Sequence, residues 1–197
     1  MQQHDALAAV ISVVAALRSL GVRYYLCGSF ASTFYGSSRM TADVDLVAEL
    51  LPSHVASFAE ALRPDFYVDE RMILDAIARK SCFNVIHRPT SFKVDVFAVK
   101  SRPYDRNVME RIAERRLDES VPTSHFSFPS VEDTVLAKLE WYRLGDEISE
   151  RQWGDVLGVM KVNGPSLDRP YLDKWAGELN VADLLAKAWK EVEGDRP

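Results

Sequence analysis

Three aspartates occupy positions where charged side chains are costly. Asp43 and Asp45 alternate with aliphatic residues in DVDLVAEL (43–50), and Asp95 lies within the apolar run SFKVDVFAV (91–99). Residues two apart in a strand point to the same face, so Asp43 and Asp45 project together. A carboxylate is expensive to bury unless it is paired. If the two strands are neighbours, all three carboxylates converge and repel one another unless a cation lies among them.

The chemistry that such a cluster favours is the binding of a divalent cation. Ligand sets made only of oxygen atoms suit Mg²⁺ or Mn²⁺, and Mg²⁺ usually completes its shell with water and substrate phosphates. Two simpler arrangements are also compatible with these residues. Asp43 and Asp45 can mark an exposed strand edge, and Asp95 can pair with Lys93 or with an arginine elsewhere in the chain.

Gly28 and Ser29 precede this cluster by about 15 residues and introduce a short predicted helix. Glycine lacks a side chain, so a phosphate can approach its backbone. Backbone N–H groups at the start of a helix favour an anion. Gly-Ser before a helix is common, and it is the combination with the aspartates that predicts phosphate binding.

The elements that must position these residues follow from the apolar periodicity. Up to residue 129 the pattern predicts a mixed α/β (α+β) fold, a sheet with packed helices. The predicted strands are 22–27, 43–50, 81–87, 91–99 and 125–128, with an extended piece at 66–68. The predicted helices are 5–20, 30–35, 53–62, 70–79 and 103–116.

After Pro129 the pattern becomes almost purely helical. Ser130, Ser149 and Asp168 are predicted N-caps, each followed by an amphipathic run. We therefore expect two domains, an α/β core over 1–129 and a C-terminal helical unit over 130–197.

Composition limits the class of protein. The 197 residues are 47% hydrophobic and 27% charged, as in soluble globular proteins. No apolar run approaches the roughly 18–20 residues that span a bilayer, and the N-terminus does not resemble a signal peptide. We expect a cytoplasmic protein without a membrane partner. The two cysteines, Cys27 and Cys82, are too few for a four-thiolate zinc site and are predicted to be buried, reduced thiols.

The segments LCGSFASTFYGSSRMTADVDL and KVDVF together resemble the DNA polymerase β-like nucleotidyltransferase superfamily. The approach from Arg39 to Asp43 is most similar to the minimal bacterial branch, which includes AbiEii-type toxins of toxin–antitoxin pairs. The C-terminal part looks like bacterial proteins described as nucleotidyltransferase-like. The resemblance covers almost the whole chain and is strongest over residues 25–98.

The resemblance implies a role for each matching residue. Asp43, Asp45 and Asp95 would be catalytic and would bind Mg²⁺ or Mn²⁺, with Asp95 also the base for the attacking hydroxyl. The implied nucleotide-binding residues are Gly28, Ser29, Arg39, Lys138 and Asp155. From the residues alone, Lys138 could equally be a lysine beside the core, and Asp155 an ordinary surface carboxylate.

The expected activity is therefore transfer of an NMP from an NTP to a hydroxyl acceptor, with release of pyrophosphate. The alternative is a non-catalytic module on the same fold that binds a nucleotide or a protein. The acceptor is open between tRNA or another RNA 3′ end, a protein hydroxyl and a small molecule such as an aminoglycoside. The net charge of −5 favours a small or cationic acceptor, whereas the basic segment 100–116 and the toxin branch, with its antitoxin partner, favour RNA.

Overall fold

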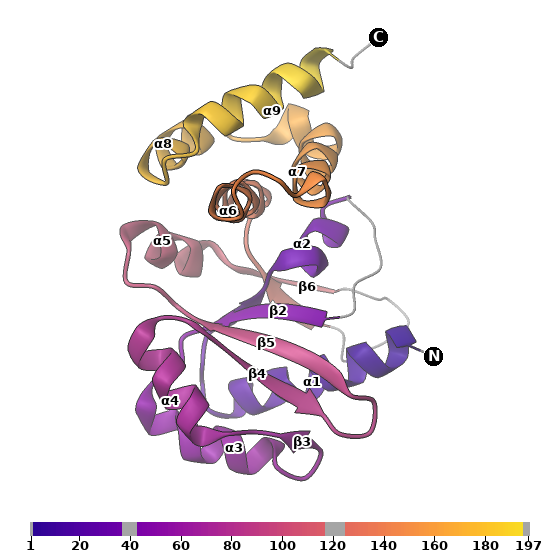
Figure 1. The fold of residues 1–197 in the computed structure, drawn as a ribbon, viewed down its shortest axis with the longest axis vertical. Coiled ribbons are helices and arrows are strands. Elements are labelled where there is room, and N and C mark those ends of the chain that lie inside the picture. The colour runs from indigo at the N-terminus through magenta and orange to yellow at the C-terminus, as the bar shows by residue number, and fades with distance from the viewer. Residues whose placement is uncertain (1, 37–42, 117–124, 195–197) are drawn as a thin grey trace. The chain divides into compact units, whose positions relative to one another are not determined.

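The computed structural model describes residues 2–36, 43–116 and 125–194 (Figure 1). Its contacts divide the chain into two compact units. The sheet unit is Met1–Phe30 with Met40–Phe128, and the helical unit is Ala31–Arg39 with Pro129–Pro197. Arg39 is among the positions outside the described residues.

The sheet unit is built on a five-stranded mixed sheet with the order β1-β2-β5-β4-β3. The pair of β2 and β5 is parallel, and the other pairs are antiparallel. The strands are β1 (Tyr24–Leu26), β2 (Asp43–Ala48), β3 (Phe66–Tyr67), β4 (Cys82–His87) and β5 (Phe92–Ala98). The mixed α/β class predicted from the sequence is confirmed.

One face of this sheet is covered by helices α1 (Gln2–Ser19), α3 (Val55–Leu62) and α4 (Glu70–Arg79), as Figure 1 shows. The short 3₁₀ turn η1 (Pro52–His54) leads into α3. The apolar residues that alternate along the two central strands are fully buried on this face: Val44, Leu46, Val94 and Val96. Alternation then sends the polar residues of the same strands to the opposite face.

A second, two-stranded sheet joins β6 (Ala113–Arg116) to β7 (His125–Phe128). The predicted strand 125–128 is confirmed, but the predicted helix 103–116 is wrong in its second half. Helix α5 ends at Arg111 (Pro103–Arg111), and Ile112 turns to an extended ψ of 142°. The exposed residues that follow Arg111 are compatible with either a helix or a strand. They form a strand because they pair with β7, whose Phe126 and Phe128 are buried.

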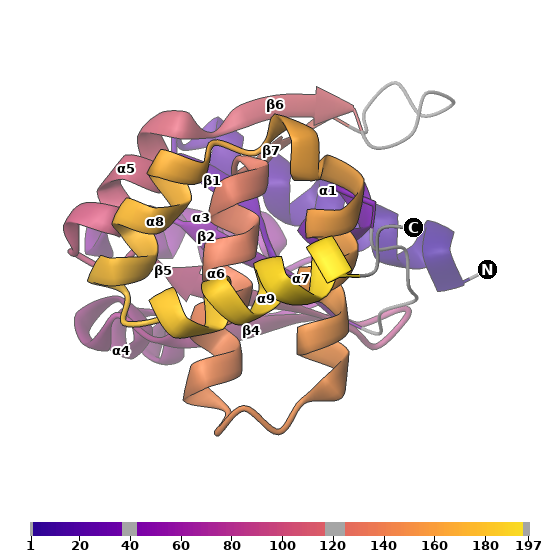
Figure 2. The same ribbon diagram turned by 90° about the horizontal axis from the view of Figure 1, so that it is seen from above.

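The helical unit contains four α-helices among its residues from Pro129 to Gly194: α6 (Val131–Leu144), α7 (Glu150–Asn163), α8 (Arg169–Glu178) and α9 (Ala182–Gly194), with the 3₁₀ turn η2 (Gly164–Ser166). Helices α6 and α7 lie side by side (Figure 2). The predicted caps are confirmed, because Ser130, Ser149 and Asp168 accept hydrogen bonds from the N–H groups three residues on.

The helix that follows Gly28 belongs to both units. Helix α2 (Gly28–Phe34) begins in the sheet unit, and its residues from Ala31 are part of the helical unit. Tyr35 fixes this end, since its hydroxyl donates to Pro129 O at 2.6 Å and its carbonyl accepts from Asn163 Nδ2 at 2.8 Å. None of the helices in the described part of the chain has the length and apolar character to cross a membrane.

Candidate functional site

The polar face of the central strands carries the three predicted aspartates. Strands β2 and β5 run in parallel with Asp45 and Asp95 as Cα partners, and Asp43 lies opposite Lys93. Neighbouring strands are about 4.8 Å apart, so each pair consists of immediate neighbours. We call these four residues the carboxylate row. Opposite charges across a strand pair attract and like charges repel, so a cation near the Asp45–Asp95 pair would be stabilising.

Lys93 supplies a cation from within the row. Its Nζ lies 2.6 Å from Asp95 Oδ2, and the lysine side chain is 43% exposed while that of Asp95 is 14% exposed. The hydrogen bond to Asp95 raises the pKa of Lys93, with the charges of Asp95, Asp43 and Asp45 adding to the effect against partial desolvation. The sequence allows either Lys93 or a distant arginine beside Asp95, and in the structure Lys93 occupies this position.

Gly28 lies directly against the row. Its φ is +57°, and a Cβ built on it would lie 2.0 Å from Asp45 Oδ2. The absent side chain of Gly28 therefore makes room for the Asp45 carboxylate. Ser29 is 6% exposed, and Cys27 N donates to Asp45 O at 2.9 Å, which ties the start of α2 to β2. Phosphate binding by Gly28 and Ser29 stays a prediction.

Strand β4 adds two residues that the sequence pattern did not assign to the site. Asn84 is the Cα partner of Asp95, and Cys82 is the partner of Phe97 on the same face. The alternation in CFNVIH (82–87) could have indicated that Cys82 and Asn84 share the polar face, since Phe83 and Val85 are buried on the other face.

The prediction that both cysteines are buried is wrong: Cys27 is partly buried and Cys82 is exposed. Surrounding atoms nevertheless desolvate the sulfur of Cys82. This desolvation, followed by the charges of Asp95 and Asp45 and opposed by that of Lys93, raises its pKa from 9.0 to about 12. The pKa of the Cys82 thiol therefore depends in part on the charges of the carboxylate row.

The row has the donor chemistry of a site for a hard cation. Its three carboxylates offer only oxygen ligands, as Mg²⁺ and Mn²⁺ prefer. Within residues 2–36, 43–116 and 125–194, no three His, Cys, Asp or Glu side chains yet converge as a metal-binding group. Lys93 binds one oxygen of Asp95 in this arrangement. The three carboxylates therefore have the ligand chemistry that Mg²⁺ or Mn²⁺ requires, and the Asp95 carboxylate is paired with Lys93 in this structure.

Lys138 and Asp155 form a buried ion pair in the helical unit. The Nζ of Lys138 on α6 is 2.5 Å from Oδ2 of Asp155 on α7, and the two side chains are 10% and 3% exposed. The interpretation of Asp155 as a surface carboxylate is therefore wrong, and it orients Lys138. These two residues belong to the helical unit and the carboxylate row to the sheet unit. A nucleotide-binding role for the pair stays a prediction.

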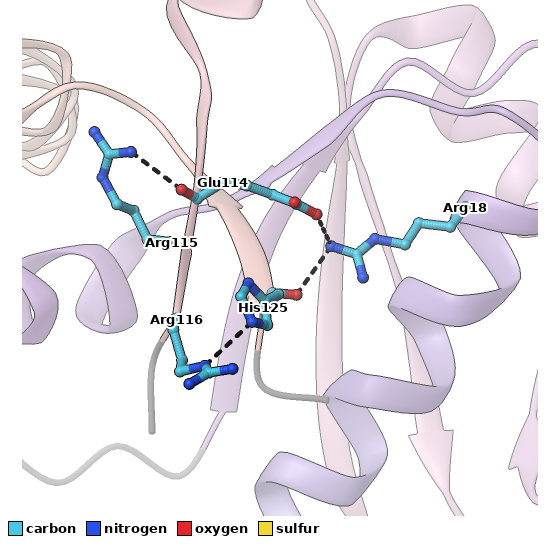
Figure 3. A network of polar contacts seen from close by, with 5 residues as sticks. All are labelled: Arg18, Glu114, Arg115, Arg116 and His125. Carbon is cyan, nitrogen blue, oxygen red and sulfur yellow. Dashed lines mark hydrogen bonds and ion pairs between the residues drawn. The ribbon is translucent and has the colours of Figure 1, made fainter. Parts of the chain in front are cut away.

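The basic segment 100–116 is divided between α5 and β6, and several of its arginines contact the protein itself. Arg102 pairs with Asp105 at 2.6 Å, and Arg106 donates to Ser101 O at 2.6 Å. Around β6, Arg18 of α1 pairs with Glu114 and donates to His125 O, while Arg116 Nε donates to His125 Nε2 at 3.1 Å (Figure 3). These contacts join α1 to the β6–β7 sheet, so they have a structural role independent of RNA.

Neither a family model nor a curated protein matches the chain. Solved structures do. An antigenic nucleotidyltransferase-like protein from Paracoccidioides brasiliensis is similar with a TM-score of 0.55 at 18% identity, covering 94% of this chain and 93% of that one. The structure of ANT(2″)-Ia in complex with adenylyl-2″-tobramycin is similar with a TM-score of 0.58 at 9% identity, covering 88% and 96%. The chain therefore has a nucleotidyltransferase-like fold.

Proposed function

We propose that the protein is a metal-dependent nucleotidyltransferase, which moves an NMP from an NTP to a hydroxyl acceptor and releases pyrophosphate. The observation that carries this proposal is the opposition of Asp45 and Asp95 in the parallel pair β2–β5, with Asp43 on the same face. Two like charges directly opposed in a sheet lower stability. A site that binds a cation and phosphates explains why the chain places them there, and a nucleotidyltransferase-like fold supports it.

Asp43, Asp45 and Asp95 would hold Mg²⁺ or Mn²⁺. When bound, such an ion neutralises phosphate charge and stabilises the attacking and leaving oxygens. In the proposed reaction the acceptor oxygen bonds to the α-phosphorus, the bond from that phosphorus to the bridging oxygen breaks, and pyrophosphate leaves with the electron pair. The hydroxyl proton passes to a carboxylate oxygen of Asp95. The ion pair with Lys93 engages Oδ2 of Asp95, so the second carboxylate oxygen would be the one that accepts the proton.

The remaining predicted residues would bind the nucleotide. Backbone N–H groups at Gly28 and Ser29 would contact phosphate oxygens, and Arg39 would neutralise phosphate charge. For Lys138 and Asp155, the buried ion pair of the helical unit, a nucleotide-binding role is proposed from the resemblance alone. Positioning and charge neutralisation are the main contributions a protein makes to such a reaction.

A non-catalytic binding module is the second candidate, and one observation favours it. Lys93 already compensates part of the charge of the carboxylate row without any metal. A binding module would show no Mn²⁺-dependent gain in thermal stability with an NTP, whereas a ligand that binds the folded enzyme raises its stability by mass action.

For the acceptor we propose a small hydroxyl-bearing molecule, with RNA and protein hydroxyls as the competing classes. The net charge of −5 favours a cationic acceptor. The complex of ANT(2″)-Ia with adenylyl-2″-tobramycin shows this fold with an adenylylated aminoglycoside. The AbiEii resemblance leads to a different proposal, in which the protein is a toxin that modifies RNA and is neutralised by an antitoxin.

The test incubates the full chain with each α-labelled NTP, Mg²⁺ or Mn²⁺, and one acceptor class at a time: aminoglycosides, bulk tRNA or protein. Asp45→Asn removes one charge of the row without changing the shape of the residue. Asp65→Asn is the matched control, because Asp65 is an exposed residue of the same unit between α3 and β3. We expect transfer by the wild type and D65N but not by D45N. Equal labelling by D45N would contradict the assignment of the site.

A further inference from the structure

Lys93 is an internal charge of the carboxylate row rather than an ordinary surface lysine. It lies on β5 opposite Asp43 and two residues before Asp95, so the pleat directs all three side chains to one face. Its Nζ binds Asp95 Oδ2 at 2.6 Å. The row thus combines three carboxylates with one ammonium group.

The position of Lys93 brings it into competition with a divalent cation. A metal ion bound to Asp95 would lie close to the Lys93 ammonium group, which is 2.6 Å from Asp95 Oδ2, and the two positive charges would repel each other. The lysine side chain is long, and 43% of it is exposed. It can therefore rotate toward solvent without unpacking Val94 or Val96, which lie on the other face.

We propose that Lys93 is the counter-ion of the carboxylate row and that the metal displaces it from Asp95, so that Lys93 sets the metal concentration at which the site fills. This inference rests on the proposed function. It assigns a residue that adjusts metal affinity, in addition to the residues that would bind the metal.

Neutral substitutions at Lys93 provide the test. Lys93→Met and Lys93→Gln both keep a long side chain and remove the charge, so either one suffices if the other fails to fold. Coulomb repulsion between a monovalent and a divalent cation about 5 Å apart in a water-like dielectric corresponds to about a tenfold change in affinity. Lys93→Arg retains the charge, and Lys100→Met removes one charge just beyond the end of β5.

The measurement is binding of Mn²⁺ alone to the full chain, followed by the loss of the free Mn²⁺ signal in electron paramagnetic resonance. We expect K93M and K93Q to reach half-saturation at about a tenth of the wild-type Mn²⁺ concentration, with K93R and K100M close to wild type. Wild-type binding with K93M and K93Q unchanged or weaker would overturn the role of Lys93 and leave the proposed function intact. No binding by the wild type or by either neutral variant would overturn both.

Discussion

Asp45 and Asp95 are Cα partners in the parallel pair of β2 and β5, so two carboxylates stand directly opposite each other beside Gly28. Neither β2 nor β5 is an edge strand, because β1 and β4 flank them. The aspartates therefore do not mark an exposed edge, although the sequence alone is compatible with one. Lys93 places a positive charge 2.6 Å from the Asp95 member of this pair.

Removing one charge from this pair should separate stability from activity. We expect Asp45→Asn to fold with a thermal midpoint close to that of the wild type in EDTA, because its repulsion of Asp95 across the strand pair falls while the Lys93–Asp95 ion pair is kept. Transfer should fall by about 10²–10³-fold, as when other preorganised electrostatic groups are removed. Calorimetry and single-turnover transfer check the two parts. A large loss of stability with D45N would contradict the account of repulsion.

Gly28→Ala should be more costly than the conformation of its backbone alone predicts. Gly21→Ala is the control, since Gly21 has a similar φ of +66° and open space where its Cβ would lie. A left-handed alanine costs about 1–2 kcal/mol. At Gly28 the new Cβ also collides with Asp45 Oδ2, and overpacking adds about 1–3 kcal/mol. Urea unfolding gives both values, and equal losses would show that the contact with Asp45 is unimportant.

Cys82 should report metal binding through its reactivity. With a pKa near 12, its thiolate is scarce at pH 8, so alkylation should be at least about a hundredfold slower than for a free thiol and should accelerate as the pH rises. A divalent cation on the row would offset the charges of Asp95 and Asp45, lower this pKa and speed alkylation severalfold.

The reaction is best followed with iodoacetamide in a Cys27→Ser background, because the chain has only two cysteines. Adding Asp45→Asn to that background removes one of the charges that raise the pKa, so the metal-free rate should rise. An alkylation rate that does not change with Mg²⁺ would argue against a cation beside Asp95 and Asp45.

The buried pair of Lys138 and Asp155 should behave as a unit. Lys138→Met breaks the buried ion pair with Asp155, and breaking a buried ion pair typically costs about 3–5 kcal/mol. The double variant with Asp155→Leu should be more stable than the sum of the single losses predicts, by about 1–3 kcal/mol. Urea unfolding of the four proteins gives this coupling, and additive losses would contradict it.

The sheet could be predicted from the sequence because period-two alternation fixes which side chains share a face. This alternation groups Asp43 with Asp45, and the pairing of β2 with β5, which the sequence left as a condition, adds Asp95 to the same face. The sequence could not decide whether Lys93 or a distant arginine accompanies Asp95, since the choice depends on strand neighbours and rotamers. Strand β6 could not be told from helix because its exposed residues carry little periodicity, and pairing with β7 determines its conformation.

The central claim is that the α-phosphorus of an NTP is the atom attacked. It is tested most directly by incubating the wild type with Mg²⁺, an acceptor panel and ATP labelled at either the α- or the γ-phosphorus, with D45N in parallel. The account predicts that α-label passes to an acceptor, that γ-label leaves as pyrophosphate, and that D45N does neither. Transfer of γ-label to an acceptor, or no wild-type reaction with any NTP and acceptor class, would contradict it.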